Sequence, residues 1–297
     1  MITKIIAAIA YIILAPVAGF LLESLDQKLA DKLQHRASAP FMQPLCEIRS
    51  QFGRKASNRE ASAPNRFRVF CLVGHLVLTI GAGAIFFCGG DLLMVIFTEV
   101  TAIVLMAMAM RTSSGASRVS ALKRDADLAL LRMLAVLPML LLAAVGFSMT
   151  GGSFAVSELA ISARMAVLPL PGIFIGCLCT VMILLGKHPF GMGRGAGSLG
   201  DAADEINAAD GTGVNGWLRL TGWYRTILSL GLLGLFFCNG TNMGFAIGAI
   251  VSIVAYFLMT IVGSRFAELI PRAAFRFAWI IAVAFGLVNL FELLLLL

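Results

Sequence analysis

Long runs of apolar residues constrain this chain more than any other feature. A helix needs about 20 apolar residues to cross a bilayer, because the hydrocarbon core is about 30 Å thick. Such runs recur along the whole chain, which is 59% hydrophobic and only 13% charged. This composition excludes a soluble globular domain, in which about a quarter of the residues are charged. The sequence predicts about eight spans in one domain of residues 1–297, at roughly 4–23, 68–89, 91–110, 127–148, 165–186, 220–238, 243–263 and 276–297.

The basic residues orient these spans, because short loops rich in lysine and arginine stay in the cytoplasm. All of them except Lys4 and Arg164 fall in or beside the connections after spans one, three, five and seven. The pattern predicts a multi-pass protein of the cytoplasmic (inner) membrane with both termini on the outer side. It also explains the net charge of +7, so the basic residues do not indicate binding to nucleic acid.

The connection after the first span, residues 24–67, is long and densely charged. Leucines at 22, 25, 29 and 33 recur every three or four residues, which predicts that the first helix continues beyond the membrane. Leu45, Ile48 and Phe52 repeat that spacing, which predicts a short amphipathic helix on the membrane surface or under a partner. The alternative is a solvated connector whose basic residues only fix orientation.

The same loop carries a resemblance to a known family. The residues that carry this resemblance are Asp26, Lys28, Gln34, Arg36, Pro40, Gln43, Pro44 and Glu47. They resemble the first loop of the membrane subunit of energy-converting NiFe hydrogenases, of the formate hydrogenlyase and ferredoxin-linked types. That family is homologous to subunit 1 of respiratory NADH dehydrogenase. Ala39 and Gln27 depart from the family's usual Gly and Arg, whereas its Gly near the end of helix one is present as Gly19.

A second long cytoplasmic loop, residues 187–219, carries a weaker part of the resemblance. Lys187, Pro189 and Phe190 match the start of a family loop motif, although Gly191 stands where the family has Asp. An acidic cluster follows at Asp201, Asp204 and Glu205. The resemblance implies that such carboxylates belong to an ion-coupling path, and burial among like charges raises carboxyl pKa values towards neutrality. The alternative is a solvated acidic loop. Two membrane carboxylates that the family often has are replaced by Leu137 and Leu184.

Few ionisable residues fall inside the predicted spans. Glu99 lies well within the third span, where a charged group costs a few kcal/mol, so an ion-coupling role or a polar partner is expected. The alternative is a protonated, hydrogen-bonded helix contact. His75 is expected to be a packed histidine, and Arg132 is expected to reach the interface. The aromatic residues beside Arg225, such as Trp223, are also expected at the interface.

The cysteines give no sign of a metal site. Six are present, none in a CxxC pair, and most fall inside apolar runs where cysteine behaves as a small hydrophobic residue. The resemblance implies that this chain holds no cofactor of its own. The resemblance places the NiFe centre and the iron–sulfur clusters in partner subunits.

Two other classes of protein share some of these features. Asp125 with Asp127, and Asp201 with Asp204, could hold Mg²⁺ and a pyrophosphate, as in intramembrane prenyltransferases. A small secondary transporter would show inverted repeats and broken helices. Pro169 and Pro171 interrupt the fifth span, but no partner half repeats this pattern.

The sequence therefore predicts an all-α integral membrane protein with a long cytoplasmic first loop that contains an amphipathic helix. The resemblance implies a non-catalytic membrane-anchoring and energy-coupling subunit of a hydrogenase complex. Its expected partners are the iron–sulfur and NiFe subunits and antiporter-like membrane subunits that move H⁺ or Na⁺. Asp26, Arg36, Gln43 and Glu47 are the expected docking residues. A quinone-site subunit of a respiratory NADH dehydrogenase-like complex is the alternative.

Overall fold

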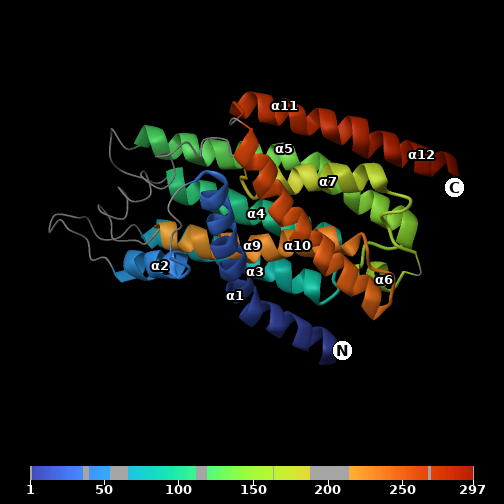
Figure 1. The fold of residues 1–297 in the computed structure, drawn as a ribbon, viewed down its shortest axis with the longest axis horizontal. Coiled ribbons are helices and arrows are strands. Elements are labelled where there is room, and N and C mark those ends of the chain that lie inside the picture. Colours follow the sequence, from blue (N-terminus) through green and yellow to red (C-terminus); the bar gives the residue numbers. More distant parts are fainter. Residues whose placement is uncertain are drawn as a thin grey trace.

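The computed structural model describes residues 2–35, 40–53, 66–111, 119–162, 164–187, 214–266 and 269–296. Within these ranges the chain is helical, apart from an isolated bridge between Asp91 and Ala155. Figure 1 shows an elongated bundle in which most helices follow the long axis and α1 crosses them at a steep angle. Both ends of the chain lie toward the end of the bundle that carries α6. The all-helical prediction is confirmed for the described residues.

The first helix, α1, runs from Ile2 to Leu33. It continues about ten residues beyond the predicted span 4–23, as the leucine spacing predicts. It packs closely on α9 at Gly19, where a Cβ atom would lie 2.5 Å from the Cβ of Trp223 and 2.8 Å from its Cα. Such distances are far inside van der Waals contact, so only glycine lets the two helices approach here. After α1, the predicted amphipathic helix forms as α2, Gln43–Gly53, which packs against α1 and α9.

The core lies between four long helices. These are α3 (Arg66–Phe87), α4 (Leu92–Arg111), α5 (Val119–Gly151) and α9 (Val214–Leu235). Gly89, at a positive φ of 77°, turns the chain tightly between α3 and α4, a backbone conformation that favours glycine. Fully buried Phe147 on α5 and Phe236 just after α9 meet at the centre, with ring centroids 4.5 Å apart.

The predicted fifth span, 165–186, forms a shorter helix than expected. After the short α6 (Val156–Ile161), helix α7 covers only Pro171–Leu184. Pro171 has no backbone N–H and a fixed φ, so it occupies the first turn and the chain before it is irregular. Buried Asn289 satisfies backbone groups at the start of α7. Its Oδ1 accepts a hydrogen bond from Ile173 N (3.1 Å), and its Nδ2 donates one to Pro169 O (3.1 Å). Fourteen residues extend about 21 Å, less than the hydrocarbon thickness.

The C-terminal third consists of α10 (Asn242–Arg265) followed by an interrupted helix. That helix comprises α11 (Pro271–Ile281), a π-helical turn η1 (Ala282–Leu287) and α12 (Val288–Leu296). Helix α10 packs on α9 and α1, whereas α11 and η1 pack on α5 and α7. In Figure 1 the end of α10 meets the start of α11 at one corner of the bundle.

Among the described residues, six helices are long and apolar enough to cross a membrane. They are Lys4–Leu33, Arg66–Phe87, Leu92–Arg111, Asp127–Gly151, Asn242–Arg265 and Pro271–Leu296. The structure therefore supports a multi-pass membrane protein, but the predicted count of eight spans is not confirmed. Helix α7 is too short, and α9 carries Arg219 and Arg225 within its 22 residues.

Candidate functional site

The predicted site residues divide between described and undescribed parts of the chain. Asp26 and Lys28 lie on α1, Gln34 follows it, and Gln43, Pro44 and Glu47 lie on α2. Glu99 lies on α4, and Lys187 follows α7. The remaining predicted residues, Arg36, Pro189, Phe190, Asp201, Asp204 and Glu205, lie outside the described residues.

The first ion-pair cluster joins α1, α2 and α9. Arg219 binds Glu23 through Nε (3.0 Å) and Nη2 (2.8 Å), and its Nη1 binds Glu47. Glu23 also accepts a hydrogen bond from the indole Nε1 of Trp223. On α2, Gln43 donates to Glu47 at 2.7 Å, which fixes that carboxylate. One arginine therefore holds the amphipathic helix against the bundle.

The charge of Glu47 is stabilised at this position. Partial burial disfavours the ionised carboxylate, but hydrogen bonds from Gln43 and Arg219 and the charge of Arg219 outweigh this effect. The pKa of Glu47 is therefore lowered from its ordinary value of 4.5. The ion pair with Arg219 is intact at neutral pH.

The second ion-pair cluster joins α1 to α10 and to the end of α7. Lys187 Nζ donates to Asp26 Oδ1 (2.6 Å) and to Thr260 Oγ1 (2.7 Å), and Thr260 in turn donates to Asp26. The same ammonium lies 3.6 Å from the ring centroid of Tyr256, a cation–π contact. The Lys187 side chain is only 10% exposed, so its charge is held by these groups more than by water.

Both clusters meet on one face of α1, because Glu23 and Asp26 are three residues apart on the helix. We call the five charged residues Glu23, Asp26, Glu47, Lys187 and Arg219 the α1 junction. Lys187 is the last described residue before the undescribed stretch 188–213, and Arg219 lies near the start of the helix that follows it. The junction therefore connects the first long loop and both ends of the second.

Another ion pair lies deeper in the bundle. Arg225 on α9 donates from Nε to Glu99 Oε2 at 3.2 Å, and the two side chains are 14% and 10% exposed. Glu99 Oε1 and Arg225 Nη2 are buried and have no hydrogen-bond partner among the described residues. Buried polar atoms of this kind are rare and costly.

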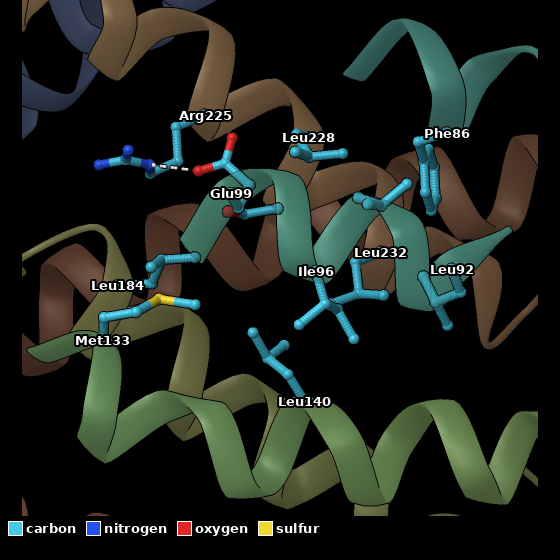
Figure 2. A pocket seen from close by; sticks show the side chains of 12 residues that line it. Phe86, Leu92, Ile96, Glu99, Met133, Leu140, Leu184, Arg225, Leu228 and Leu232 are labelled. Atoms are coloured by element: carbon cyan, nitrogen blue, oxygen red, sulfur yellow. Dashed lines mark hydrogen bonds and ion pairs between the residues drawn. The ribbon is translucent and has the colours of Figure 1, made fainter. Parts of the chain in front are cut away.

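A small cavity adjoins this pair (Figure 2). Its volume is about 40 Å³, and apart from the ion pair and Ser229 it is lined by apolar side chains. They come from α3, α4, α5, α7 and α9: Phe86, Leu92, Val95, Ile96, Met133, Leu140, Leu184, Leu228 and Leu232. In Figure 2 the carboxylate and the guanidinium lie at one side of the ring of labelled aliphatic side chains. A charged pair in such apolar surroundings is strongly sensitive to the loss of either partner.

Helix α9 supplies contacts that sequence reasoning missed. Trp223 and Tyr224, which were expected at the membrane–water interface, are 7% and 6% exposed and pack against α1. Arg219 and Arg225 were counted only as cytoplasmic charges, yet each pairs with a carboxylate of another helix. Glu23 and Thr260 were not singled out either. The available signal was Arg225 inside the predicted span 220–238, with Arg219 directly before that span.

The other predicted docking residues have modest contacts. Lys28 lies 5.0 Å from the ring centroid of Phe41, and Pro44 is buried where α2 begins. Gln34 is exposed after the end of α1. The described residues contain no group of three or more His, Cys, Asp or Glu side chains placed to hold a metal ion.

The comparisons with known proteins identify the fold. No family model matches the sequence, and no curated protein matches it. The solved structures that the chain matches include that of the membrane-bound sulfane sulfur reductase (MBS), described as an archaeal respiratory membrane complex. The match has a TM-score of 0.74 and 21% identity, and it covers 96% of this chain and 99% of the other. The whole chain thus has the fold of a chain from a respiratory membrane complex.

Proposed function

We propose that this chain is the membrane-anchoring and energy-coupling subunit of a multisubunit redox complex of the energy-converting hydrogenase kind. It docks a water-soluble arm that carries iron–sulfur clusters and a NiFe centre, and it holds no cofactor of its own. Its flanks contact antiporter-like subunits that move H⁺ or Na⁺. The observation that carries the proposal is the end-to-end match in fold to a chain of a respiratory membrane complex.

The α1 junction supports a docking and coupling role. It holds α2, both ends of the second long loop and α10 on two neighbouring carboxylates of α1. A partner that binds the first loop through Gln43 or Glu47 therefore also acts on Arg219 and α9. Helix α9 carries Arg225, the partner of Glu99, six residues further along.

This arrangement gives the coupling a concrete route. Redox turnover in the docked arm shifts the two long loops, the shift reaches α9 through Arg219, and the Glu99–Arg225 pair responds. The acidic residues Asp201, Asp204 and Glu205 of the second loop take part in the same response. Coupling of this kind requires two sites and an element whose position both sites bias, and α9 fits that description.

Co-purification tests the assignment. The tagged chain is extracted in a gentle detergent, and its partners are identified by mass spectrometry together with assays for nickel and iron. Iron–sulfur and nickel-containing subunits are the expected result. A metal-free chain that remains alone in every detergent would contradict the proposal and favour a small secondary transporter.

Two related assignments predict different partners. The matched MBS chain belongs to a sulfane sulfur reductase, so iron–sulfur subunits without nickel would favour a sulfur-reducing complex. Flavin and NADH-oxidising subunits would favour a quinone-site subunit of a respiratory NADH dehydrogenase-like complex. Under either outcome the chain would remain the membrane subunit of a redox complex, but that complex would not be a hydrogenase.

Carboxylate substitution tests the coupling. Replacing Glu99, Asp201, Asp204 and Glu205 with the corresponding amides is expected to abolish substrate-driven H⁺ or Na⁺ uptake into inverted vesicles. The redox activity of the complex should persist, because no cofactor is removed. The matched control is Glu292→Gln, which changes an exposed carboxylate on α12. Unchanged ion uptake in the fourfold variant would refute the coupling route.

A further inference from the structure

The corner where α10 ends and α11 begins carries three exposed arginines, Arg265, Arg272 and Arg276. None of them makes an ion pair with a carboxylate in the part of the chain that the structure describes. The sequence between them contributes one acidic residue, Glu268, which lies outside the described residues. The segment from 265 to 276 therefore has a net charge of +2.

The arginines continue into an apolar surface. Arg272 and Arg276 are four residues apart, so they lie one turn apart on the same face of α11. The next turn exposes Trp279 (46%) and Ile280 (64%), and η1 then exposes Val283 and Leu287. The opposite face, including Ala274, Ala278 and Ala282, is buried against the bundle. The exposed side of this helix thus changes from cationic to aromatic to aliphatic along its length.

This order matches the layers of a phospholipid. Phosphate lies at the level of the basic residues, tryptophan prefers the glycerol region, and aliphatic side chains face the acyl chains. From Arg276 to Trp279 the helix rises about 4.5 Å, which suits the step from phosphate to glycerol. Phe266 and Ile270, 62% and 72% exposed, extend the apolar surface between the two helices. The corner also lies at the end of the bundle where the charge pattern predicts the cytoplasmic leaflet, which is rich in anionic lipid.

We propose that this corner, which we call the arginine corner (Arg265, Arg272, Arg276 and Trp279), binds an anionic phospholipid. The arginines hold the phosphate through charge-assisted hydrogen bonds, and Trp279 lies beside the glycerol. The site is independent of the α1 junction and of the proposed redox partners. It gives this chain a preference for anionic lipid on one defined face.

Lipid retention tests the site directly. The complex is purified in mild detergent, exchanged into mixtures of phosphatidylglycerol and phosphatidylcholine, and analysed for bound lipid by native mass spectrometry. The wild type is expected to retain phosphatidylglycerol in preference to phosphatidylcholine. The Arg272→Gln/Arg276→Gln variant should bind it about 25-fold more weakly, since each arginine near an anionic headgroup contributes roughly a factor of five. Arg164→Gln, an exposed arginine in the connection before α7, is the control and should bind as the wild type does.

A second readout covers the case in which the double variant folds poorly. Phosphatidylglycerol with brominated acyl chains should quench the tryptophan fluorescence of the wild type more than brominated phosphatidylcholine does. The difference should disappear in Trp279→Phe and persist in Arg272→Lys/Arg276→Lys, which keeps the charge. Equal binding of the two lipids by the wild type would overturn the proposal. So would a protein subunit that crosslinks to the arginine corner and excludes lipid from it.

Discussion

At the residue scale, the Glu99–Arg225 pair shows how two buried charges stabilise one another in apolar surroundings. Each side chain is largely removed from water, and the surrounding wall is aliphatic. Neither charge would be stable there alone, because desolvation of an unpaired ion costs several kcal/mol. The pair therefore fixes α4 and α9 to one another at this depth.

Removing one member of the pair should cost more than removing both. Glu99→Leu leaves a buried guanidinium and is expected to destabilise the protein by about 3–5 kcal/mol. Glu99→Leu/Arg225→Leu should recover most of that loss, because two aliphatic side chains suit the apolar cavity. Thermal unfolding in detergent, followed by circular dichroism, measures both. A double variant no more stable than the single one would show that the pair has no such interdependence.

Glu47 gives the α1 junction a pH dependence. Its folded-state pKa lies below the ordinary 4.5, so the contribution of the Glu47–Arg219 pair is present above that pH. The contribution is lost as the pH falls through the lowered pKa, because the protonated carboxyl no longer attracts Arg219. Hydrogen exchange in α2, corrected for intrinsic rates and compared with α3, should increase as the pH falls from 6 to 3. Glu47→Gln should show the higher exchange already at pH 6, and a wild-type profile in that variant would be inconsistent with this role.

At the element scale, the position of α9 depends on how closely it approaches α1. Gly19 lies against the backbone of Trp223, and Glu23 is one turn further along α1. The close approach brings Glu23 within reach of both Arg219 and the Trp223 indole. Gly19 and the Glu23–Arg219 ion pair therefore belong to one contact between α1 and α9.

A single methyl group at this contact tests the idea. In Gly19→Ala the added Cβ would lie 2.8 Å from the Cα of Trp223, so α1 and α9 must separate. We expect a loss of roughly 1–3 kcal/mol, typical of an overpacked core. Gly81→Ala is the control, because no atom lies within 4 Å of the Cβ position there. It should be neutral or stabilising by up to about 1 kcal/mol, since alanine is the better helix former. Equal melting temperatures for the two variants would mean that the approach at Gly19 is not tight.

At the scale of the whole molecule, the connections follow a simple rule of charge. The described ends of α1, α4 and α10 near the predicted cytoplasmic loops carry Lys32, Arg111 and Arg265. Both termini lie toward the end of the bundle that carries α6. The charge distribution predicts that this end lies on the outer side of the membrane.

Reporter fusions check this orientation. An alkaline phosphatase, active only outside the cytoplasm, fused after Leu297 should be active. The same reporter inserted after Arg111, at the end of α4, should be inactive. A fluorescent protein that matures only in the cytoplasm should give the reverse pattern at both positions. The opposite result would invert the topology.

Local patterns predicted the parts of this structure that depend on neighbours in sequence. The spacing of leucines predicted the extension of α1, and the spacing of Leu45, Ile48 and Phe52 predicted the helix α2. Contacts between distant residues were not predictable in this way. Glu23 and Arg219 are 196 positions apart, and Glu99 and Arg225 are 126 apart. Periodicity assigns a residue to a face of its own helix but does not identify its partner on another. The predicted count of eight spans is not confirmed, because α7 begins only at Pro171 and is 14 residues long.

The α1 junction also has a consequence for protein engineering. Lys187 and Arg219, which flank the stretch 188–213, are both bound to carboxylates on one turn of α1. These two ion pairs hold the residues that flank the stretch, whatever its length. Closing a longer loop between fixed points costs only about 0.6 kcal/mol for each doubling of its length. A folded reporter domain inserted between Lys187 and Arg219 should therefore leave the helices in place, so this stretch is a suitable insertion site for building a biosensor.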